Sequence, residues 1–378
     1  MKSITLANVK NKTVLLRVDF NVPLKNGRVV DNKRIKESLP TIKYLLNKNA
    51  KIILVSHLGR PDGKVVQEFK MNSVAKELAK LLGKKEMPVL TPEEDVKDAL
   101  KNHEIIFLEN IRFYPEEEKN DLKFAKKLAN LADIYVNDAF GVSHRAHASI
   151  VGVKKFLPSY TGFLVEKEVK MISSLLEKPK KPFVVILGGA KVRDKIKVIE
   201  NLAKKCDLIL IGGAMMFTFF KAKEYDLGTF KFESNSVKFA KEMLKKYEEK
   251  IVLPEDVMCA LKLDANKGRN FESTKIPKKM IGLDIGRETI NFYKFILKDA
   301  KTVFWNGPLG KVENPPFDNG TKEIAKFLAN LSATVVIGGG DTAALIEKLK
   351  LTKRYSHVST GGGASLEFLE GKGLVGLK

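Results

Sequence analysis

Short apolar runs alternate along the chain with longer stretches in which apolar residues recur at helical spacing. A cluster of Gly, Asn, Asp or His follows most of the short runs. This alternation is typical of βαβ units, in which helices connect parallel strands. The predicted strands span 13–18, 51–55, 105–108, 134–136, 183–187, 208–211, 302–305, 334–337 and 356–358. The predicted helices span 33–46, 73–82, 122–131, 195–204, 322–328 and 342–349.

The length of the chain sets the number of domains. At roughly 150 residues per domain, 378 residues give two or more. Residues 164–176 (LVEKEVKMISSLL) have helical spacing and are closed by two prolines within 179–182. We therefore expect an interdomain helix over 164–178, with an N-terminal domain at 1–163 and a C-terminal domain at 179–359. The fold class that follows is α/β, with two doubly wound, Rossmann-like parallel-sheet domains.

Composition narrows the class of protein. With 44% hydrophobic and 30% charged residues, the chain is globular rather than disordered or fibrous. The longest uncharged apolar stretch, 208–220, is too short for a membrane span and contains Gly212 and Gly213. Lysines interrupt the apolar residues near the amino end, so we expect no secretory signal. The only cysteines, Cys206 and Cys259, form no CxxC pair, which favours a reducing cytoplasm.

The formal net charge of +22 favours anionic partners without choosing among them. Lysines mixed with glutamates, as in 241–250, are typical of solvated helix faces. Three arginines stand alone in short nonhelical segments: Arg60, Arg112 and Arg145. A guanidinium offers a fork of donors that matches carboxylate and phosphate oxygens. These arginines therefore predict discrete anion contacts rather than a diffuse nucleic-acid surface.

The carboxyl ends of parallel strands are where such folds bind ligands, and the two halves differ there. The first half places polar and cationic residues after its strands: Asp19, Asn21, His57, Arg60, Arg112, Arg145 and His147. The second half places glycines there, at 188–189, 212–213, 307, 338–340 and 361–363. Glycine lets the backbone approach a phosphate, and a helix N-terminus attracts its charge. We expect the first domain to bind a small polyanion and the second a nucleotide.

Three residues of the second half are candidates for phosphoryl transfer. Lys191 and Lys195 are four residues apart and would share one helix face near a phosphate. Asp341 follows a glycine cluster and could hold Mg²⁺, which takes few protein oxygens. The alternatives are a solvated lysine at position 195 and a simple helix cap at position 341. His144 and His147 have no Cys or Glu neighbours of metal-site spacing, which disfavours a metal site there.

Several motifs are missing. The chain has no GxxxxGK[ST] phosphate loop and no HRD or DFG set, which excludes a Walker-type NTPase and a protein kinase. A GxGxxA pattern at 338–343 lacks the acidic residue that would bind a ribose, and a GxGxxG pattern at 371–376 has no helix after it. The first rival interpretation, a nucleotide-linked dehydrogenase, is disfavoured by that missing acid. The second, a nucleic-acid-binding protein, lacks a basic stripe interleaved with aromatic residues.

Eight motifs, in order, carry a family resemblance. They are LLRVDFNVP (15–23), SHLGRP (56–61), LENIRF (108–113), DAFGVSHRAHAS (138–149), ILGGAKV (186–192), VFWNGPLG (303–310), IGGGDTA (337–343) and HVSTGGGASLEFLEGK (357–372). Over essentially its whole length the chain closely resembles the phosphoglycerate kinase family. The resemblance implies reversible transfer of the acyl phosphate of 1,3-bisphosphoglycerate to MgADP, giving 3-phosphoglycerate and MgATP. It also implies direct in-line transfer after hinge-bending closure, in a cytoplasmic, monomeric glycolytic enzyme without membrane or specific nucleic-acid partners.

The resemblance assigns roles to individual residues. The triose site falls on Asp19, Phe20, Asn21, Arg34, His57, Leu58, Gly59, Arg60, Arg112, Arg145 and His147. The nucleotide site falls on Lys191, Lys195, Gly212, Gly213, Gly282, Asn306, Glu313 as a ribose contact, Gly339, Gly340, Asp341 as the Mg²⁺ ligand, and Thr342. Arg34, Lys191, Gly340 and Gly363 would stabilise the transferring group. The tail at 360–378 is expected to pack on the first domain.

Four residues depart from the family pattern. Arg193 stands where a small residue is usual, and Ala214 stands where a third glycine is common. Arg287 replaces a common proline, and Lys311 lies where an apolar residue is common. Arg193 and Lys311 add positive charge beside the expected nucleotide site, so we expect them to alter nucleotide affinity or its salt dependence.

Overall fold

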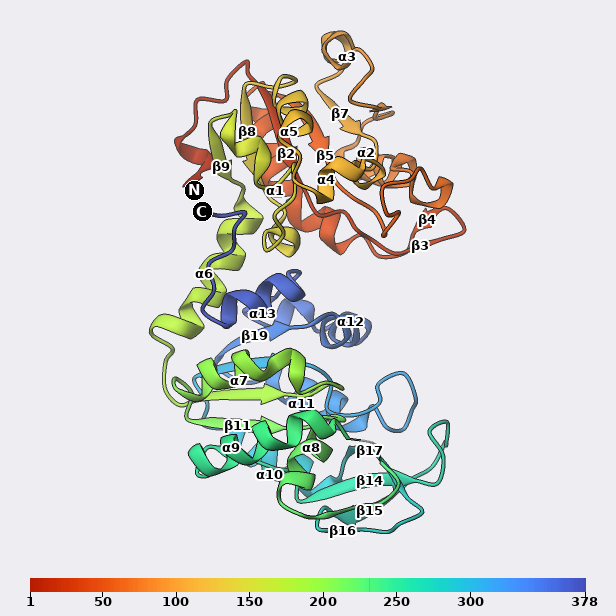
Figure 1. The fold of residues 1–378 in the computed structure, drawn as a ribbon, viewed down its shortest axis with the longest axis vertical. Helices are drawn as coiled ribbons and strands as arrows, with labels where there is room; N and C mark the ends of the chain where they lie inside the picture. The colour runs from red at the N-terminus through yellow and green to blue at the C-terminus, as the bar shows by residue number, and fades with distance from the viewer. Residues whose placement is uncertain (231) are drawn as a thin grey trace. The chain divides into compact units, whose positions relative to one another are not determined.

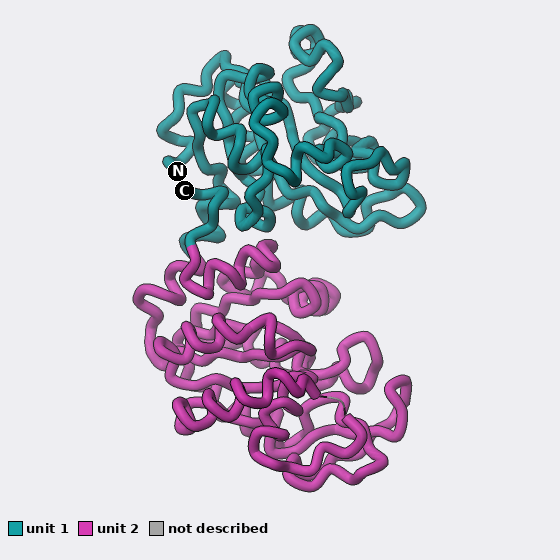
Figure 2. The backbone as a smooth tube through the Cα atoms, in the orientation of Figure 1, with its two compact units in different colours: residues 1–170, 373–378 teal, residues 171–372 magenta. Residues whose placement is uncertain are grey.

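The computed structural model describes residues 1–230 and 232–378 and divides into two compact units (Figure 2). Unit 1 contains residues 1–170 and 373–378, and unit 2 contains residues 171–372. Each unit is built around a sheet of parallel strands with helices between them. The predicted α/β class with two Rossmann-like sheets is confirmed.

The sheet of unit 1 has the strand order β1-β9-β8-β2-β5-β7-β6, and every pairing is parallel. Alternate residues of its central strands point into two separate apolar cores. Leu16 and Ile52 belong to one core, and Leu15 and Ile53 belong to the other. A sheet covered on both faces needs uninterrupted apolar strands, which explains the strong sequence signal. The strands are β1 (Lys2–Ser3), β2 (Thr13–Arg17), β5 (Lys51–Val55), β6 (Val89–Leu90), β7 (Ile105–Leu108), β8 (Ile134–Asn137) and β9 (Ser159–Thr161), with the hairpin β3 (Leu24–Lys25) and β4 (Arg28–Val29) beside them.

The helices of unit 1 connect these strands (Figure 1). Helix α2 shows how a local signal sets a boundary, since Gly83 follows its last residue with a φ of 67° and closes it in the left-handed conformation. The α-helices are α1 (Lys33–Asn47), α2 (Asn72–Leu82), α3 (Val96–Asn102), α4 (Pro115–Glu118), α5 (Leu122–Ala129) and α6 (Phe163–Glu177). The 3-10 helices are η1 (Ile4–Leu6), η2 (Gln67–Phe69), η3 (Ile111–Phe113), η4 (Phe140–Val142) and η5 (Gly152–Lys155).

The main sheet of unit 2 has the order β13-β11-β10-β18-β19-β20 and is also parallel throughout. A second, antiparallel sheet of β15, β14 and β17 lies at one end of the unit (Figure 1). The strands are β10 (Phe183–Leu187), β11 (Leu208–Ile211), β12 (Asp226–Leu227), β13 (Ile251–Val252), β14 (Asp256–Ala260), β15 (Arg269–Glu272), β16 (Lys275–Ile276), β17 (Ile281–Ile285), β18 (Thr302–Asn306), β19 (Thr334–Gly338) and β20 (His357–Val358). The helices are η6 (Arg193–Lys195), α7 (Ile196–Ala203), α8 (Met216–Ala222), η7 (Ser234–Ser236), α9 (Val237–Lys246), α10 (Arg287–Leu297), α11 (Asn319–Leu328), α12 (Gly340–Lys348), η8 (Thr352–Arg354) and α13 (Gly363–Leu369).

The predicted elements are all present, with small shifts at their ends. Four strand predictions, 51–55, 105–108, 183–187 and 208–211, match the observed bounds. Helix α12 begins two residues before the predicted start, because Gly339 adopts a φ of 86° and turns the chain into the helix. The antiparallel sheet of unit 2 was not predicted.

The division of the chain differs in detail from the expected one. The boundary between the units falls after Lys170, inside α6. Of the tail expected on the first domain, 373–378 belong to unit 1, while 360–372 belong to unit 2. Apolar and polar contacts explain this split. Helix α13 packs on α7, where Asn201 donates a hydrogen bond to the carbonyl of Leu369 (2.7 Å).

Residues 373–378 bind unit 1 mainly through their backbone. The N–H of Gly376 donates to the carbonyl of Ser143 (2.8 Å), and its own carbonyl accepts from the side chain of Asn137 (3.2 Å). The amino group of Met1 donates to the carbonyl of Leu377 (3.0 Å), so the two ends of the chain lie side by side (Figure 1). A β-carbon at position 376 would lie 2.7 Å from Ile150, which is why glycine is required there.

Asp138 gives unit 1 a pH-dependent stability. Its Oδ1 accepts the N–H groups of Leu164 and Val165 in the first turn of α6, while its Oδ2 is buried without a hydrogen-bond partner. Burial raises the pKa of Asp138 to about 7, although these N–H donors lower it. Between pH 4 and 7 the folded protein thus retains a proton that the unfolded chain releases. Stability contributed by this group therefore falls as the pH rises through that range.

We expect Asp138→Asn to flatten the decline in unfolding free energy between pH 5 and pH 8 by up to about 3 kcal/mol. Denaturant unfolding of both proteins at the two pH values measures this. Asp133→Asn is the matched control, because Asp133 is exposed and its carboxylate also accepts a backbone N–H, that of Thr13 (2.8 Å). An equal pH dependence of wild type and Asp138→Asn would contradict the assignment.

Candidate active site

The candidate site of unit 1 lies at the carboxyl ends of four adjacent strands, β8, β2, β5 and β7. The polar residues that the sequence places after these strands therefore come to one edge of the sheet. Three arginines, Arg17, Arg34 and Arg112, are close enough to His57 to act on its charge. This edge is strongly cationic, as predicted, and it is built from segments far apart in the sequence.

Asp19 and Arg34 form an ion pair at this edge, through Oδ2 of Asp19 and Nη1 of Arg34. The other carboxylate oxygen, Oδ1, is buried without a hydrogen-bond partner and lies 3.8 Å from Nδ1 of His57. Burial raises the pKa of Asp19, but the charges of Arg34 and Arg17 and the hydrogen bond from Arg34 outweigh it and hold the pKa below its usual value. The carboxylate is thus charged, and its buried Oδ1 is an acceptor without a hydrogen-bond donor in the described part of the chain.

His57 is buried and held in its neutral form. Burial, followed by the charges of the surrounding arginines, lowers its pKa well below the usual value, and the charge of Asp19 only partly opposes this. A guanidinium can only donate, so the contact between Arg17 Nη2 and His57 Nδ1 (3.5 Å) makes Nδ1 the acceptor. The ring proton then resides on Nε2.

The backbone between the strands is fixed by two asparagines. Asn21 accepts the N–H of Gly59 through its Oδ1 (2.9 Å). Asn110 bonds both backbone groups of Leu58, accepting its N–H (3.3 Å) and donating to its carbonyl (2.7 Å). The ring of Phe20 is buried near that of Phe107, and its backbone N–H donates to the hydroxyl of Ser56 (2.9 Å). Asn110 was not predicted as a functional residue.

The remaining arginines differ in how firmly they are held. Arg112 is buried, donates to the carbonyl of Gly59 (3.2 Å) and lies 3.2 Å from a carboxylate oxygen of Glu118. Burial, with the charges of Arg17 and Arg145, lowers its pKa. Arg145 is exposed beside it. Arg60 is also exposed.

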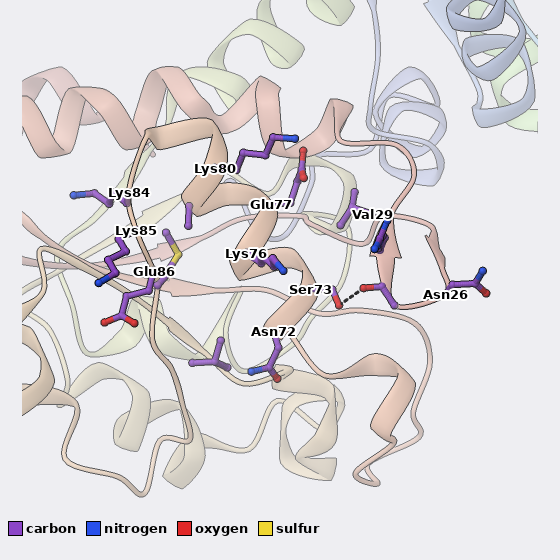
Figure 3. Close-up of a pocket in the computed structure, with 15 residues that line it drawn as sticks. Asn26, Val29, Asn72, Ser73, Lys76, Glu77, Lys80, Lys84, Lys85 and Glu86 are labelled. Carbon is purple, nitrogen blue, oxygen red and sulfur yellow. Dashed lines mark hydrogen bonds between the residues drawn. The ribbon is translucent and has the colours of Figure 1, made fainter.

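Two open cavities flank the β3–β4 hairpin of unit 1. One, of about 790 Å³, is lined in part by Asn21, Leu58 and Gly59 and thus adjoins the cationic edge. The other, of about 1040 Å³, follows α2 between the hairpin and residues 84–87 (Figure 3). Its charged lining consists of four lysines, one arginine and two glutamates. None of its described side chains has a buried polar atom without a hydrogen-bond partner. We assign no ligand to this second groove.

The glycines of unit 2 fall into two kinds. Gly188, Gly213 and Gly307 are needed for packing of the loops against one another, since a β-carbon there would lie 2.1, 2.5 and 2.4 Å from a neighbouring backbone atom. Gly340, at the start of α12, has nothing within 4 Å of its β-carbon position. The first group builds the edge of the sheet, and Gly340 leaves open space at a helix N-terminus, where a phosphate is favoured.

A cavity of about 300 Å³ at this edge brings together four residues of the predicted nucleotide site: Gly213, Gly282, Glu313 and Asp341. Phe217 and Phe230, stacked with ring centroids 3.9 Å apart, form an apolar wall. Gly282 allows this wall, because a β-carbon there would lie 2.3 Å from the ring of Phe217. A flat apolar wall beside an open helix N-terminus is suited to a nucleotide base and its phosphates.

The other predicted residues surround this cavity. Thr342 accepts the N–H of Gly307 (3.0 Å) and so fixes a loop rather than presenting a free hydroxyl. Asn306 is buried, and its Nδ2 has no hydrogen-bond partner. Lys191 is exposed, whereas Lys195 is partly buried, and this burial lowers its pKa although the charges of nearby acids, including Asp341, raise it.

The positions of the acidic side chains indicate which of them could hold Mg²⁺. Across residues 1–230 and 232–378, no group of three or more His, Cys, Asp or Glu side chains is placed to bind a metal. His147 has one acidic neighbour, with 3.7 Å between its Nδ1 and Oε1 of Glu117. The exposed carboxylate of Asp341 lines the cavity at the N-terminus of α12. It fits Mg²⁺, which takes one or two protein carboxylates and completes its shell with phosphate and water.

Two of the four unusual residues are engaged by neighbours. The ammonium of Lys311 donates to the carbonyl of Leu263 (2.8 Å). The guanidinium of Arg193 lies 3.5 Å from Asp194 and 3.9 Å from Glu233. The acidic neighbours of Arg193 partly offset its extra positive charge, whereas the carbonyl beside Lys311 leaves that charge in place. The effect of both residues on nucleotide binding stays a prediction.

The two parallel sheets place the chain among α/β proteins of the class that binds nucleotides and other small ligands at the carboxyl ends of its strands. Comparison with known proteins identifies the family within this class. The phosphoglycerate kinase family model matches residues 4–372. A phosphoglycerate kinase of Fervidobacterium nodosum is 51% identical over 391 aligned residues, which cover 100% of this chain and 98% of that protein. One of Pelotomaculum thermopropionicum is 48% identical, covering 100% of this chain and 98% of that protein.

Solved structures agree with the sequence relatives. The phosphoglycerate kinase of Coxiella burnetii has a TM-score of 0.88 and 38% identity, covering 99% of this chain and 97% of that one. That of Pyrococcus horikoshii has a TM-score of 0.87 and 33% identity, covering 100% and 98%. The chain belongs to the phosphoglycerate kinase family. It is a kinase that transfers a phosphoryl group between 1,3-bisphosphoglycerate and MgADP, giving 3-phosphoglycerate and MgATP.

Proposed function

We propose that the two sheet edges divide the substrates of this reaction between the units. The triose phosphate binds at the cationic edge of unit 1, and the nucleotide binds at the glycine-lined edge of unit 2. The observation that carries this proposal is the contrast between the edges: one gathers buried and exposed arginines, and the other gathers open backbone N–H groups beside an apolar cavity.

In unit 1, the free acceptor of Asp19 and the Nε2 proton of His57 bind polar groups of the triose, and Asn21 and Arg34 lie beside them. Arg112, Arg145 and Arg60 bind its phosphate, with His147 alongside. Phe20, Leu58 and Gly59 contribute backbone. The support is that Asp19 is charged and His57 is neutral at this edge in the absence of a ligand, so neither group has to change its protonation state on binding.

In unit 2, the cavity beside Phe217 takes the base, Glu313 binds the ribose, and the N-terminus of α12 binds the phosphates. Asp341 would hold Mg²⁺, which neutralises phosphate charge when it is bound. The residues that complete this proposed site are Lys191, Lys195, Gly212, Gly213, Gly282, Asn306, Gly339, Gly340 and Thr342. The lysines and the open backbone of Gly340 provide positive potential where the phosphates would lie.

Transfer itself needs no nucleophile from the protein, because a carboxylate or phosphate oxygen of the substrate attacks in line. Arg34, Lys191 and the backbone N–H groups of Gly340 and Gly363 stabilise charge on the transferring group. The two bound ligands must meet for direct transfer, so closure of the units belongs to this proposal. A fall in the radius of gyration that requires both ligands would support it.

The test is a coupled assay of ATP-dependent phosphorylation of 3-phosphoglycerate, run with and without Mg²⁺. We expect turnover with Mg²⁺ and loss of nearly all turnover when the ion is withheld, because without the cation the negative charges of the nucleotide phosphates are not neutralised and the carboxylate of Asp341 repels them. An assay of NADH absorbance without ATP serves as the control for dehydrogenase activity. No turnover with 3-phosphoglycerate and MgATP would refute the proposed function.

The partners of the proposed enzyme are these small molecules. No helix in the described part of the chain has the length and apolar character needed to span a membrane. Both cysteines, Cys206 and Cys259, are buried free thiols, and burial raises the pKa of each to about 12. Unreactive thiols of this kind support the proposal of a monomer in the cytoplasm, which light scattering and fractionation would check.

A further inference from the structure

A chain of buried polar contacts runs from the short helix α4 to the cationic edge of unit 1. Its first member, Glu117, is fully buried although its neighbours Glu116 and Glu118 are exposed. Burial of a carboxylate is costly unless partners compensate for it. Glu117 therefore needs partners that stabilise its buried charge, which the solvated Glu116 and Glu118 do not need.

Glu117 uses both carboxylate oxygens. Oε2 accepts the backbone N–H of Ser149 (2.8 Å), and Oε1 accepts the hydroxyl of the same residue (2.6 Å). Oε1 also lies 3.7 Å from Nδ1 of His147. Burial raises the pKa of Glu117, but the contact with His147, the charge of Arg17 and the Ser149 hydrogen bonds together hold it below the usual value. The group is thus a buried anion.

The partner of this anion is Arg17, which is also fully buried and cannot reach a ligand. Its Nε donates to the hydroxyl of Ser149 (2.8 Å), and its Nη1 donates to the carbonyl of Val18. Its Nη2 meets Nδ1 of His57 (3.5 Å). Ser149 accordingly bridges the two buried charges, receiving one hydrogen bond and donating the other.

We propose that Glu117 is a positioning residue of the triose site, which acts through Ser149 and Arg17 to hold His57 with its Nε2 proton directed to the ligand. The inference rests on the proposed function of unit 1. Without the anion, Ser149 would lose the acceptor that orients its hydroxyl toward Arg17, so the guanidinium would be held less firmly and its contact with His57 Nδ1, which fixes the tautomer, would weaken. His147, the other neighbour of Glu117, would lose its acidic partner at the same time.

The test compares Glu117→Gln with Glu116→Gln, the exposed neighbour on the same helix. Titration calorimetry measures binding of 3-phosphoglycerate, and steady-state kinetics measure KM for 3-phosphoglycerate and for ATP. We expect Glu117→Gln to raise both the Kd and the KM for 3-phosphoglycerate by about tenfold, within the range seen for coupled buried networks. The KM for ATP should stay within about twofold of the wild-type value, since that site lies in the other unit. Glu116→Gln should match wild type.

A second variant covers the case in which Glu117→Gln fails to fold, because loss of one partner from a buried charge pair is strongly destabilising. Ser149→Ala retains both charges and removes only the bridging hydroxyl. We expect it to weaken binding of 3-phosphoglycerate by about threefold or more, again without an effect on ATP.

The outcomes separate the two proposals. If the folded variants bind 3-phosphoglycerate as tightly as wild type and lose only thermal stability, Glu117 is merely structural and the inference is overturned. If wild type itself fails to bind 3-phosphoglycerate, the proposed triose site is wrong, whatever the variants do. A selective rise in Kd for 3-phosphoglycerate supports the positioning role.

Discussion

Arg34→Ala is expected to lower kcat/KM for 3-phosphoglycerate by about 10² or more, which corresponds to about 3 kcal/mol of lost transition-state stabilisation. The guanidinium pairs with Asp19 and retains 32% side-chain exposure, so it is held at the cationic edge with donors still free for a ligand. Because charge on the transferring group develops during the reaction, loss of a fixed cation should lower kcat as well as affinity. Coupled kinetics in both directions measure the two constants.

Arg28→Ala is the matched control for this result. Arg28 lies on the exposed β3–β4 hairpin of the same unit and has no acidic partner among the described residues. We expect its kinetics to equal those of wild type. Wild-type turnover of Arg34→Ala would refute the role of Arg34. Denaturant unfolding of both variants separates a catalytic effect from the cost of leaving Asp19 buried without its partner.

Lys191→Ala is expected to lower kcat by a similar factor, about 10² or more, with little change in stability. The side chain is exposed, so its removal leaves no cavity. The loop that carries it is fixed independently, because the N–H groups of Val192 and Arg193 donate to a carboxylate oxygen of Glu233 (2.7 and 3.2 Å). The loss should therefore reflect the missing ammonium alone.

Lys197→Ala, on the exposed face of α7, is the control for Lys191→Ala. It removes the same charge six residues away and should leave kcat unchanged. If both lysine variants lose the same small amount of activity, the effect comes from the general positive potential of unit 2. In that case Lys191 has no specific role at the transferring phosphate.

The sequence predicted the parallel sheets well for a physical reason. A strand covered on both faces must be apolar throughout, so β5 and β10 (KIILV and FVVIL) are recognisable without any partner. The same reasoning fails for β15 (RNFE), whose residues are largely exposed. Its pairing with β14 depends on a strand that is some ten residues away, and no local apolar pattern marks it.

The residues of the candidate sites also differ in how far the sequence reveals them. Residues directly after strands, such as Asp19 and His57, were predictable because topology alone brings strand ends together. Glu117 was not predictable, since nothing in the run Glu116 to Glu118 marks the middle carboxylate as the buried one. Arg17 carried a weak signal that was missed: a charged residue within the apolar strand β2 needs a buried partner.

The discontinuity of unit 1 bears on the order in which the chain folds. A ribosome makes residues 1–170 first, but the segment that bonds to Asn137 and Ser143 is translated only after all of 171–372. Unit 2 is a single uninterrupted stretch and can fold as soon as it emerges. Unit 1 is thus begun first and completed last. Until residues 373–378 have been made, the groups of Asn137 and Ser143 that bind this segment lack its hydrogen bonds.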